Sequence, residues 1–418
     1  MVADVSASTA AGSARRGKIR GWARHSTAHA GHPRRDACIS SGSPVFHVYC
    51  AIAYLFIVAR VIAPLPIRLH WKVVAAAALL PGALYQFWSR VFFGNMYAPE
   101  LPFPVVALLG WTFGSFVLLL VFTVAGEILE TLYRLAARRW SHPPRGTARR
   151  VGSVVLAFAL GGFGFIQAAR LPEVHRVDLA VKDLPAQLEG FKLVQLSDLH
   201  ISKLFQRGWV QGVVERTNGI GADLIVVTGD VIDGSVEARR GDVEPLAQLR
   251  ARHGVIGIPG NHEYYFDYGA WKPRLQELGI RMLTNQHEVV QHGNAQLTVA
   301  GIADAAALRY GDEGPDLPKA LAGAPAGAPI VLLAHRPAGA ANHAQQGVAL
   351  QLSGHTHGGM VVGMAPVIGP PNEGFLSRGY RVGDMQLYVS NGTGLWMGFP
   401  LRLGKPSEIT EFVLTRGQ

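Results

Sequence analysis

Four apolar segments lie close together between residues 45 and 169, and they constrain the fold more than any other feature of this sequence. They cover residues 45–64, 71–88, 104–129 and 151–169. A helix that crosses a bilayer needs about 20 mainly apolar residues, and a helix of a soluble bundle needs a polar face that these segments lack. We therefore expect an α-helical transmembrane region over residues 44–170 with about four spans. The second segment is the shortest and contains Pro81, so it either crosses the membrane or re-enters it.

The charged residues are divided unevenly along the chain. Residues 1–150 carry 17 Lys and Arg against 5 Asp and Glu, whereas residues 151–418 carry 22 against 24. The basic excess accompanies the apolar segments, which is typical of membrane proteins, and the second part lacks the basic surface that nucleic acid requires. Residues 1–43 are rich in Ala, Ser, Gly and Arg and predict a disordered basic tail. Two cysteines exclude a disulfide framework and a cysteine-based zinc site.

Basic residues near the ends of the spans predict the orientation. Eight Lys and Arg lie in residues 130–150 and in the loop after the first segment, against three on the other face. Residues 130–150 are therefore expected in the cytoplasm and the C-terminal domain outside it. If every Lys and Arg of residues 1–43 is counted, the numbers on the two faces become equal. If the second segment does not cross the membrane, the C-terminal domain is still expected outside the cytoplasm. Arg60, Glu127 and Glu130 are expected to reach the headgroups rather than line an ion pathway.

From residue 171 onward, short Val, Ile and Leu runs alternate with polar, helix-length segments. This texture predicts an α/β domain over residues 171–418, with more antiparallel character toward its end. The expected strands are 191–196, 224–228, 255–258, 297–302, 330–334, 350–353, 387–390 and 409–414. The expected helices lie near 207–217, 243–251, 269–278 and 316–322.

The residues that suit metal chemistry follow these expected strands, where α/β sheets build their sites. They form the motifs Asp198-x-His200, Gly-Asp230-x-x-Asp233, Gly-Asn261-His262-Glu, Ala-His335 and Gly-His355-Thr-His357. Mixed Asp, Asn and His donors suit Mn, Fe or Zn, and they are too many for one tetrahedral zinc. They suffice for two metal ions that share a carboxylate. A single Asp-x-His pair is common by chance, whereas the ordered set of five motifs is not.

This order of motifs resembles the calcineurin-like metallophosphoesterase superfamily, over about residues 190–418. Within it, the run from Phe191 to His200, Gly358-Gly359 and the ending from Leu387 to Leu414 resemble the membrane-linked bacterial phosphodiesterase branch, the transmembrane metallophosphoesterases. The resemblance implies a β-sandwich flanked by helices and two divalent metal ions. It implies Asp198, His200 and His357 as ligands of one metal, Asn261, His335 and His355 as ligands of the other, and Asp230 as the bridge.

The resemblance also implies two residues that act without binding metal. His262 would stabilise or protonate the leaving oxygen, and Asp233 would orient that histidine. The expected reaction is hydrolysis of a phosphodiester or phosphomonoester by metal-activated hydroxide, with no covalent intermediate. The chain departs from the branch at Arg336, Met360 and Asn391, where Asn, Gln and Arg respectively are frequent, so its contacts with substrate are expected to differ.

Aromatic residues gather at positions 264–268 and 395–399. Packing explains them most simply, and a lipid-facing rim beside the site is the alternative, because Trp and Tyr suit the membrane interface. The expected partners are a phosphate ester, lipid-linked or not, and the inner membrane of a bacterium, with no nucleic acid. One alternative function is a UDP-2,3-diacylglucosamine pyrophosphate hydrolase, whose cytosolic substrate conflicts with the expected orientation. Another is a membrane transport or sensor protein with a regulatory metal domain.

Overall fold

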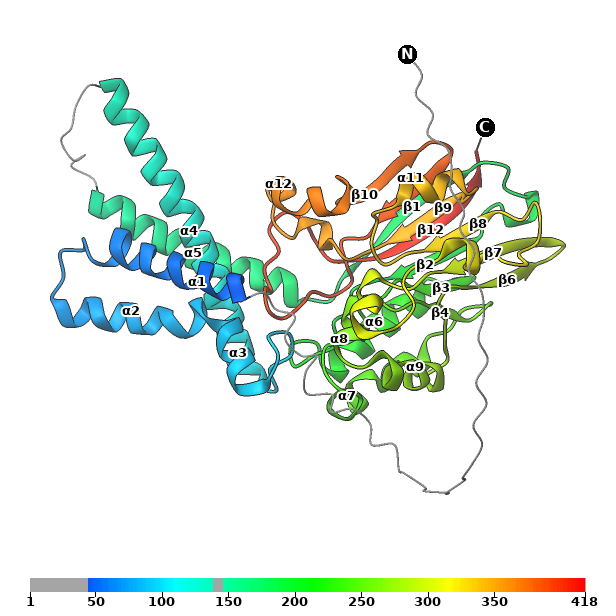
Figure 1. The fold of residues 1–418 in the computed structure, drawn as a ribbon, viewed down its shortest axis with the longest axis horizontal. Coiled ribbons are helices and arrows are strands. Elements are labelled where there is room, and N and C mark those ends of the chain that lie inside the picture. Colours follow the sequence, from blue (N-terminus) through cyan, green and yellow to red (C-terminus); the bar gives the residue numbers. More distant parts are fainter. Residues whose placement is uncertain (1–43, 138–145, 418) are drawn as a thin grey trace, which may run out of the picture. The chain divides into compact units, whose positions relative to one another are not determined.

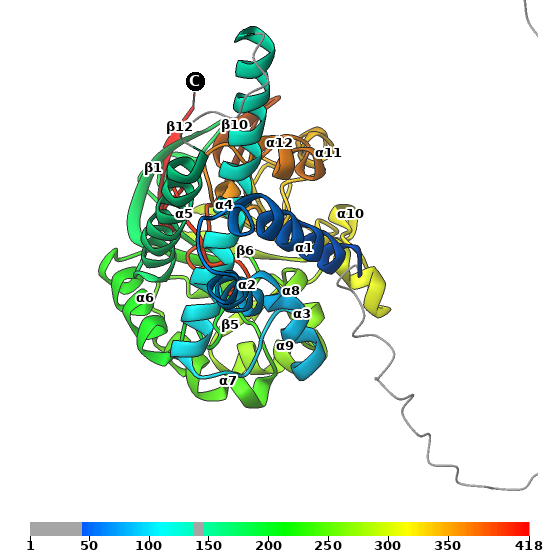
Figure 2. The same ribbon diagram turned by 90° about the vertical axis from the view of Figure 1, so that its left-hand side faces the viewer.

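The N-terminal part of the chain is helical in this computed structural model, which describes residues 44–137 and 146–417. Three helices are long and apolar enough to cross a membrane: Val45–Ile62, Phe103–Ala136 and Gly146–Ala169. The first consists of α1 (Pro44–Ile57) and a π-helical turn (Val58–Ile62), and the others are α4 (Phe103–Ala137) and α5 (Gly146–Ala169). They lie side by side in Figures 1 and 2. The tail expected over residues 1–43 lies outside the described residues.

The second apolar segment forms two short helices instead of a fourth long span. Helix α2 (Leu69–Ala83) has 15 residues, and α3 (Tyr85–Phe93) follows after a break at Leu84. At about 1.5 Å per residue, α2 is roughly 22 Å long, shorter than the hydrocarbon core of about 30 Å. Among the described residues, three helices are therefore long enough to cross a membrane, which agrees with the alternative in which the second segment does not form a full span. Pro81 stands in the last turn of α2, close to the break.

The charged residues at one end of these helices pair with one another. Arg60 pairs with Glu127, and Arg149 lies 3.2 Å from Glu127 and 2.9 Å from Glu130. Arg150 Nε donates a 2.9 Å hydrogen bond to the carbonyl of Arg60. Three helices thus share a network of ion pairs, where the sequence suggested separate contacts with headgroups. Arg138, Arg139 and Arg145, which entered the orientation argument, lie outside the described part of the chain.

The C-terminal part contains two six-stranded mixed sheets. The first sheet has the strand order β1-β12-β2-β3-β4-β5, and the second has the order β10-β11-β9-β8-β7-β6. The strands of the first sheet are β1 (Glu173–Val181), β2 (Lys192–Leu196), β3 (Leu224–Val227), β4 (Val255–Gly257), β5 (Ile280–Met282) and β12 (Glu408–Arg416). Those of the second are β6 (Gln286–His292), β7 (Ala295–Gly301), β8 (Ile330–Leu333), β9 (Leu350–Ser353), β10 (Arg378–Val382) and β11 (Met385–Val389).

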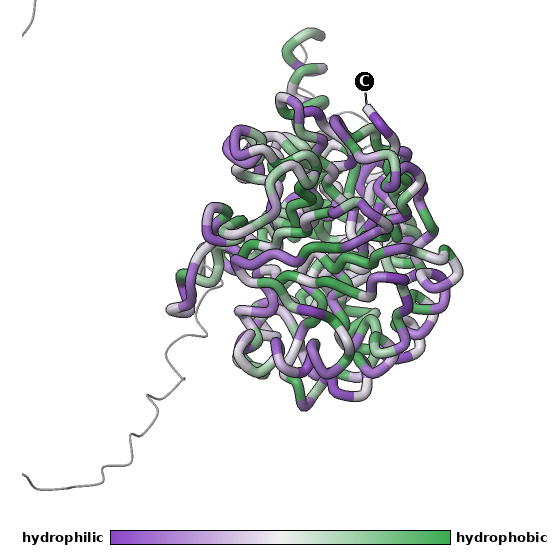
Figure 3. Tube along the Cα trace, turned by 90° about the vertical axis from the view of Figure 1, so that its right-hand side faces the viewer, coloured by the Kyte–Doolittle hydropathy of each residue, from purple (hydrophilic) through white to green (hydrophobic). Residues whose placement is uncertain are grey.

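An apolar core joins the two sheets into a sandwich. Leu193 and Val226 of the first sheet pack with Val299 and Leu352 of the second, all fully buried. A second core lies between the first sheet and its covering helices, which include α6 (Arg207–Gly219) and α9 (Tyr268–Glu277). Figure 3 shows the hydrophobic strands crossing the middle of the domain. The β-sandwich flanked by helices is therefore confirmed.

All eight expected strands are present, with ends that differ from the expected ones by at most two residues. The sequence missed β1, β5, β6 and β10, which lie at or near sheet edges, where partly exposed positions weaken an apolar run. The helix expected at 243–251 is wrong. Helix α7 (Val236–Val243) begins earlier, because the Ser235 side chain accepts a hydrogen bond from Ala238 N, and Pro245 opens a 3₁₀ turn (Glu244–Gln248). The remaining short helices include α8 (Asn261–Tyr265), α10 (Leu317–Ala320), α11 (Ala340–Gln345) and α12 (Ala365–Ile368).

Candidate metal centre

The five sequence motifs meet at one edge of the sandwich. Each follows the carboxyl end of a strand: β2, β3 and β4 in the first sheet, and β8 and β9 in the second. Strands β2, β3 and β4 are parallel to one another, as are β8 and β9, so the carboxyl ends within each sheet point the same way. The fold thereby gathers side chains that are far apart in the sequence.

The backbone of this edge adopts an unusual conformation. Five residues with side chains have positive φ angles of 45° to 68°: Asp198, His200, Asp230, His355 and His357. A non-glycine residue in this region costs roughly 1–3 kcal/mol and persists where the surrounding structure enforces it. Such residues concentrate at functional sites, so the backbone marks this edge independently of the side chains.

Two glycines allow the loops to approach one another. Gly229 has a φ of +89°, and a Cβ atom added to it would lie 2.5 Å from Gly260 N. A Cβ atom at Gly354 would lie 2.2 Å from the Asp198 carboxylate. Any larger residue would push the loops apart, so these glycines are required for the side chains to converge.

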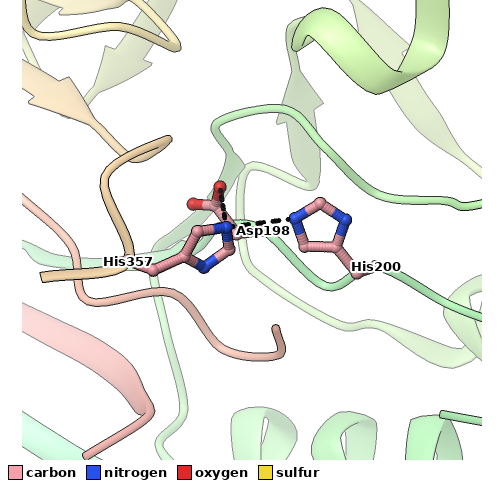
Figure 4. Close-up of side chains that lie close together, drawn as sticks. All are labelled: Asp198, His200 and His357. Carbon is pink, nitrogen blue, oxygen red and sulfur yellow. Dashed lines mark hydrogen bonds and ion pairs between the residues drawn. The ribbon is translucent and has the colours of Figure 1, made fainter. Parts of the chain in front are cut away.

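The first cluster consists of Asp198, His200 and His357, whose side chains point toward one another (Figure 4). The Nε2 atoms of the two histidines are 3.3 Å apart, and His357 Nε2 lies 3.6 Å from Asp198 Oδ1. All three residues are buried. Ser197 Oγ donates a 2.6 Å hydrogen bond to the other oxygen of Asp198, which fixes the carboxylate.

The second cluster contains Asp230, His335 and His355, with Asn261 beside them. His335 Nε2 lies 3.2 Å from both Asp230 Oδ2 and Asn261 Oδ1. His335 Nδ1 lies 2.8 Å from the Thr228 carbonyl, to which it donates, so Nε2 is the atom that faces the cluster. Asp230 Oδ2 also lies 3.7 Å from His200 Nε2 of the first cluster. One carboxylate thus stands between the two sets of ligand atoms.

Asp233 and His262 form a third group beside the first cluster. Asp233 is fully buried and accepts hydrogen bonds from His262 Nδ1 and, at 3.2 Å, from His200 Nδ1. The His262 backbone N–H donates to Asp230 Oδ1 at 2.8 Å. Asp233 therefore fixes two imidazole rings at once, and both keep Nε2 available for other contacts.

The titration properties of these groups follow from burial and from their mutual charge. Burial and the neighbouring cationic side chains hold the pKa values of His355 and His357 well below the ordinary value, so both imidazoles are neutral at pH 7. Although burial opposes the charge of His335, the carboxylates of Asp230 and Asp198 raise its pKa to about 10. In the same way, Asp230 and Asp233 raise the pKa of His262 to about 9. A proton on either ring partly balances the buried carboxylates.

Sequence reasoning assigned no role to Glu263, although this residue organises the backbone of the site. Its carboxylate is buried and accepts hydrogen bonds from three backbone N–H groups: Gly260 at 2.6 Å, Asp230 at 2.9 Å and Val231 at 2.7 Å. It thereby ties the loop after β4 to the loop after β3. Its position in the Gly-Asn-His-Glu motif was the available signal.

The residues that depart from the branch pattern have clear contacts. Arg336 Nε donates to Asp304 at 2.8 Å, and its Nη1 lies 3.0 Å from His355 Nε2. Asn391 accepts from Ser377 Oγ at 2.6 Å, and its carbonyl accepts from the fully buried Arg402 at 2.6 Å. Met360 packs against the apolar cluster that contains Leu395 and Met397. Arg336 is the departure whose side chain contacts a proposed ligand, whereas Met360 reaches His357 only through its backbone N–H, which donates to the His357 carbonyl at 3.1 Å.

A residue from a loop of the N-terminal helical region also reaches this site. Tyr97 lies between α3 and α4, and its ring centre is 5.4 Å from that of His262 and 4.9 Å from that of Tyr265. Trp396 Nε1 donates to the Tyr97 carbonyl at 3.2 Å. No motif or periodicity marks Tyr97, so sequence reasoning could not find this contact.

Comparison with known proteins places this chain in a family. Residues 191–359 match the family described as calcineurin-like phosphoesterase. A protein of Danio rerio named "Transmembrane protein with metallophosphoesterase domain" is 36% identical over 314 residues, which cover 72% of this chain and 71% of that protein. The chain belongs to the transmembrane metallophosphoesterases. A protein of Bos taurus with the same name is 33% identical over 82% of this chain and 80% of its own length.

Bacterial relatives share the similarity. A Helicobacter pylori protein named "Uncharacterized metallophosphoesterase" is 30% identical over 71% of this chain and 79% of its own length. The transmembrane metallophosphoesterase described here is thus a metal-dependent phosphoesterase with membrane helices. The donor set fits that chemistry, because it offers carboxylate oxygens and imidazole nitrogens within 4.8 Å of one another in each cluster.

Proposed function

We propose that this protein is a membrane-anchored phosphoesterase with two metal ions at the edge of its sandwich. The position of Asp230 carries the proposal, because its Oδ2 lies 3.2 Å from His335 and 3.7 Å from His200, one in each cluster. In this assignment Asp198, His200 and His357 hold one ion, Asn261, His335 and His355 hold the other, and Asp230 contacts both. Divalent ions bound there would neutralise the phosphoryl oxygens and lower the pKa of a water molecule toward neutrality.

His262 is the proposed general acid. Its raised pKa, about 9, keeps a proton on the imidazole at neutral pH, and the ring lies beside the first cluster with a centre 4.6 Å from that of His200. Asp233 holds Nδ1, so Nε2 would deliver the proton to the leaving oxygen of the ester. Arg336 is one-third exposed, lies beside the second cluster and would contact the phosphoryl oxygens there.

Several basic side chains of the membrane region gather at the end of the helices that is away from the catalytic domain. Lys72 donates to the carbonyl of Ala63, and Arg150 to that of Arg60, so several basic residues share one end of the helices. The opposite end contacts the domain, through Gln86 and the carbonyl of Gly398. By the positive-inside rule, the basic end is cytoplasmic and the catalytic domain is outside the cytoplasm of a bacterial inner membrane.

Proximity to lipid supports an ester at the membrane surface as substrate, with lipid headgroups among the candidates. Residues 358–372, directly after His357, carry no charged side chain, and Val362 and Val367 are 68% and 66% exposed. Val361 and Leu403 in this region pack against the apolar cluster of the membrane helices. The uncharged segment is therefore continuous with the membrane region and with the metal centre.

Hydrolysis by the full-length chain in detergent tests the proposal. The wild-type protein with Mn²⁺ should hydrolyse bis(p-nitrophenyl) phosphate, and Asp230→Asn should lose activity together with most of both metal ions. Asp384→Asn, at an exposed carboxylate in the turn between β10 and β11, is the matched control. Full metal content in Asp230→Asn would refute the bridging role. A C-terminal reporter that is active only in the cytoplasm would refute the orientation.

A further inference from the structure

The loop between α3 and α4, residues 94–102, leaves the membrane helices and enters the catalytic domain. Asn95 shapes the loop, because its Oδ1 accepts hydrogen bonds from Tyr97 N at 3.0 Å and Ala98 N at 2.7 Å. Glu100 then pairs with Lys203 at 3.3 Å and with Arg239, whose side chain is fully buried. These contacts fix the loop on both sides of Tyr97.

The ring of Tyr97 completes an aromatic surface next to His262. It stacks on Tyr265 with an interplanar angle of 26° and lies 5.7 Å from the Trp396 ring. Tyr265 in turn lies 5.1 Å from His262. All three aromatic residues are half-buried, so part of each stays accessible to solvent.

The place of this surface determines what it can contact. A general acid must lie within hydrogen-bonding reach of the leaving oxygen, so the group attached to that oxygen lies next to the acid. The groups beside His262 on this side are aromatic faces, which favour an uncharged group with an apolar face. The phosphate itself belongs with the metal ligands and Arg336.

We propose that Tyr97, Tyr265 and Trp396 form the binding subsite for the leaving group, and that Tyr97 also holds His262 in position. The inference rests on the proposed function, since it assumes that His262 faces the leaving oxygen. It means that the membrane region supplies one wall of the active site. A catalytic domain cut from its helices would lack that wall, so the full chain is the functional unit.

Binding of two phosphonates to the full-length, Mn²⁺-loaded chain in detergent tests the subsite. Phenylphosphonate carries an aromatic group where methylphosphonate carries a methyl group, and calorimetry gives both dissociation constants without turnover. The wild-type protein should prefer the phenyl compound. Tyr97→Ala should reduce that preference by roughly threefold to tenfold, the range expected for aromatic contacts, whereas Tyr97→Phe should retain it. The ratio is independent of the fraction of correctly folded protein.

Two further variants and one further ligand complete the test. Glu100→Gln loosens the loop but keeps the tyrosine, so it should partly lower the preference for phenylphosphonate. This variant still tests the subsite if Tyr97→Ala does not fold. Met96→Ala, on the same loop, should leave it unchanged. Tighter binding of octylphosphonate than of phenylphosphonate would indicate a leaving group that carries an acyl chain. Tighter binding of phenylphosphonate would indicate a planar leaving group from a soluble ester.

If the wild type and folded Tyr97→Ala prefer phenylphosphonate equally, Tyr97 does not line the subsite and the proposal is wrong. Equal loss in Tyr97→Phe and Tyr97→Ala would overturn the role of ring stacking. A wild-type protein that shows the phenyl preference but hydrolyses no phosphodiester would sustain the subsite and refute the proposed function instead. Metal content measured in every variant separates loss of the aromatic wall from damage to the metal centre.

Discussion

The guanidinium of Arg336 lies 3.0 Å from Nε2 of His355, a residue proposed to bind the second metal ion. The same guanidinium lies 3.3 Å from Asn261 Oδ1 and pairs with Asp304 at 2.8 Å. A fixed positive charge at this distance opposes a cation in the second position and attracts an anion to it. Arg336 should therefore weaken the binding of the second metal ion and strengthen the binding of phosphate.

Arg336→Met should have opposite effects on these two ligands. The second Mn²⁺ ion should bind about tenfold more tightly, because a nearby positive charge is removed. KM for a phosphodiester should rise by about tenfold or more, because a charge-assisted hydrogen bond is lost. Metal titration and steady-state kinetics measure the two effects. Arg381→Met, at an exposed arginine, is the control, and unchanged metal affinity in Arg336→Met would contradict the argument.

His262→Ala should separate metal binding from proton transfer. The variant should keep its metal ions, because His262 belongs to neither proposed ligand set. It should hydrolyse a diester with an alkyl leaving group roughly 10²–10⁴ times more slowly. A p-nitrophenolate leaves with little protonation, so the loss on bis(p-nitrophenyl) phosphate should be much smaller.

His287→Ala, at a partly buried histidine outside the site, is the control for this comparison. Equal losses on the two substrates would exclude protonation of the leaving group as the main role of His262. Loss of metal from His262→Ala would move this residue into the ligand set and would require a new assignment.

The parts of the fold that the sequence predicts well are those in which local patterns agree with tertiary structure. Strand β9 at Leu350–Ser353 and helix α9 are examples, because buried runs and caps determine them locally. The motif residues after five strands were predictable as a group, since parallel strands bring their carboxyl ends to one edge. Strand β6 was not, because most of its side chains are exposed or half-buried.

The contact between Tyr97 and His262 shows where sequence reasoning ends. It depends on how α3 and α4 lie against the domain, through Gln86, Glu100 and Trp396, and none of these residues has a motif or a period. The length of α2 was likewise hidden, since composition alone does not say where a break at Leu84 divides an apolar run. Long-range packing decides both features.

Metal binding should release protons. Among the side chains alone, burial opposes the charge of His335, but Asp230 and Asp198 raise its pKa to about 10, so the imidazole is protonated at pH 7. A metal ligand must be deprotonated, so an ion that binds His335 displaces that proton. The affinity for Mn²⁺ should therefore rise with pH from 6.5 to 8.5 and fall as the pH is lowered. Calorimetry in buffers of different ionisation enthalpy counts the protons, and an affinity that is independent of pH would contradict the assignment.

The uncharged segment after His357 should contact lipid. Val367 is 66% exposed, in α12, and Leu308, in the 3₁₀ turn Ala305–Tyr310, is 67% exposed. The two residues are thus matched in exposure, but the segment of Val367 continues to Val361, which packs against the membrane-helix cluster. A charge-free segment in this position is expected to enter the interfacial region of the bilayer.

Fluorescent labelling of the full-length chain in liposomes distinguishes the two positions. Val367→Cys and Leu308→Cys, each in a Cys38→Ser and Cys50→Ser background, are labelled with an environment-sensitive dye. The dye at position 367 should shift to shorter wavelength and be quenched by spin-labelled lipids, whereas the dye at position 308 should respond to aqueous quenchers. If both dyes behave like the one at position 308, the segment does not touch lipid. The metal centre would then lie away from the membrane surface, and water-soluble esters would become the better substrates to test.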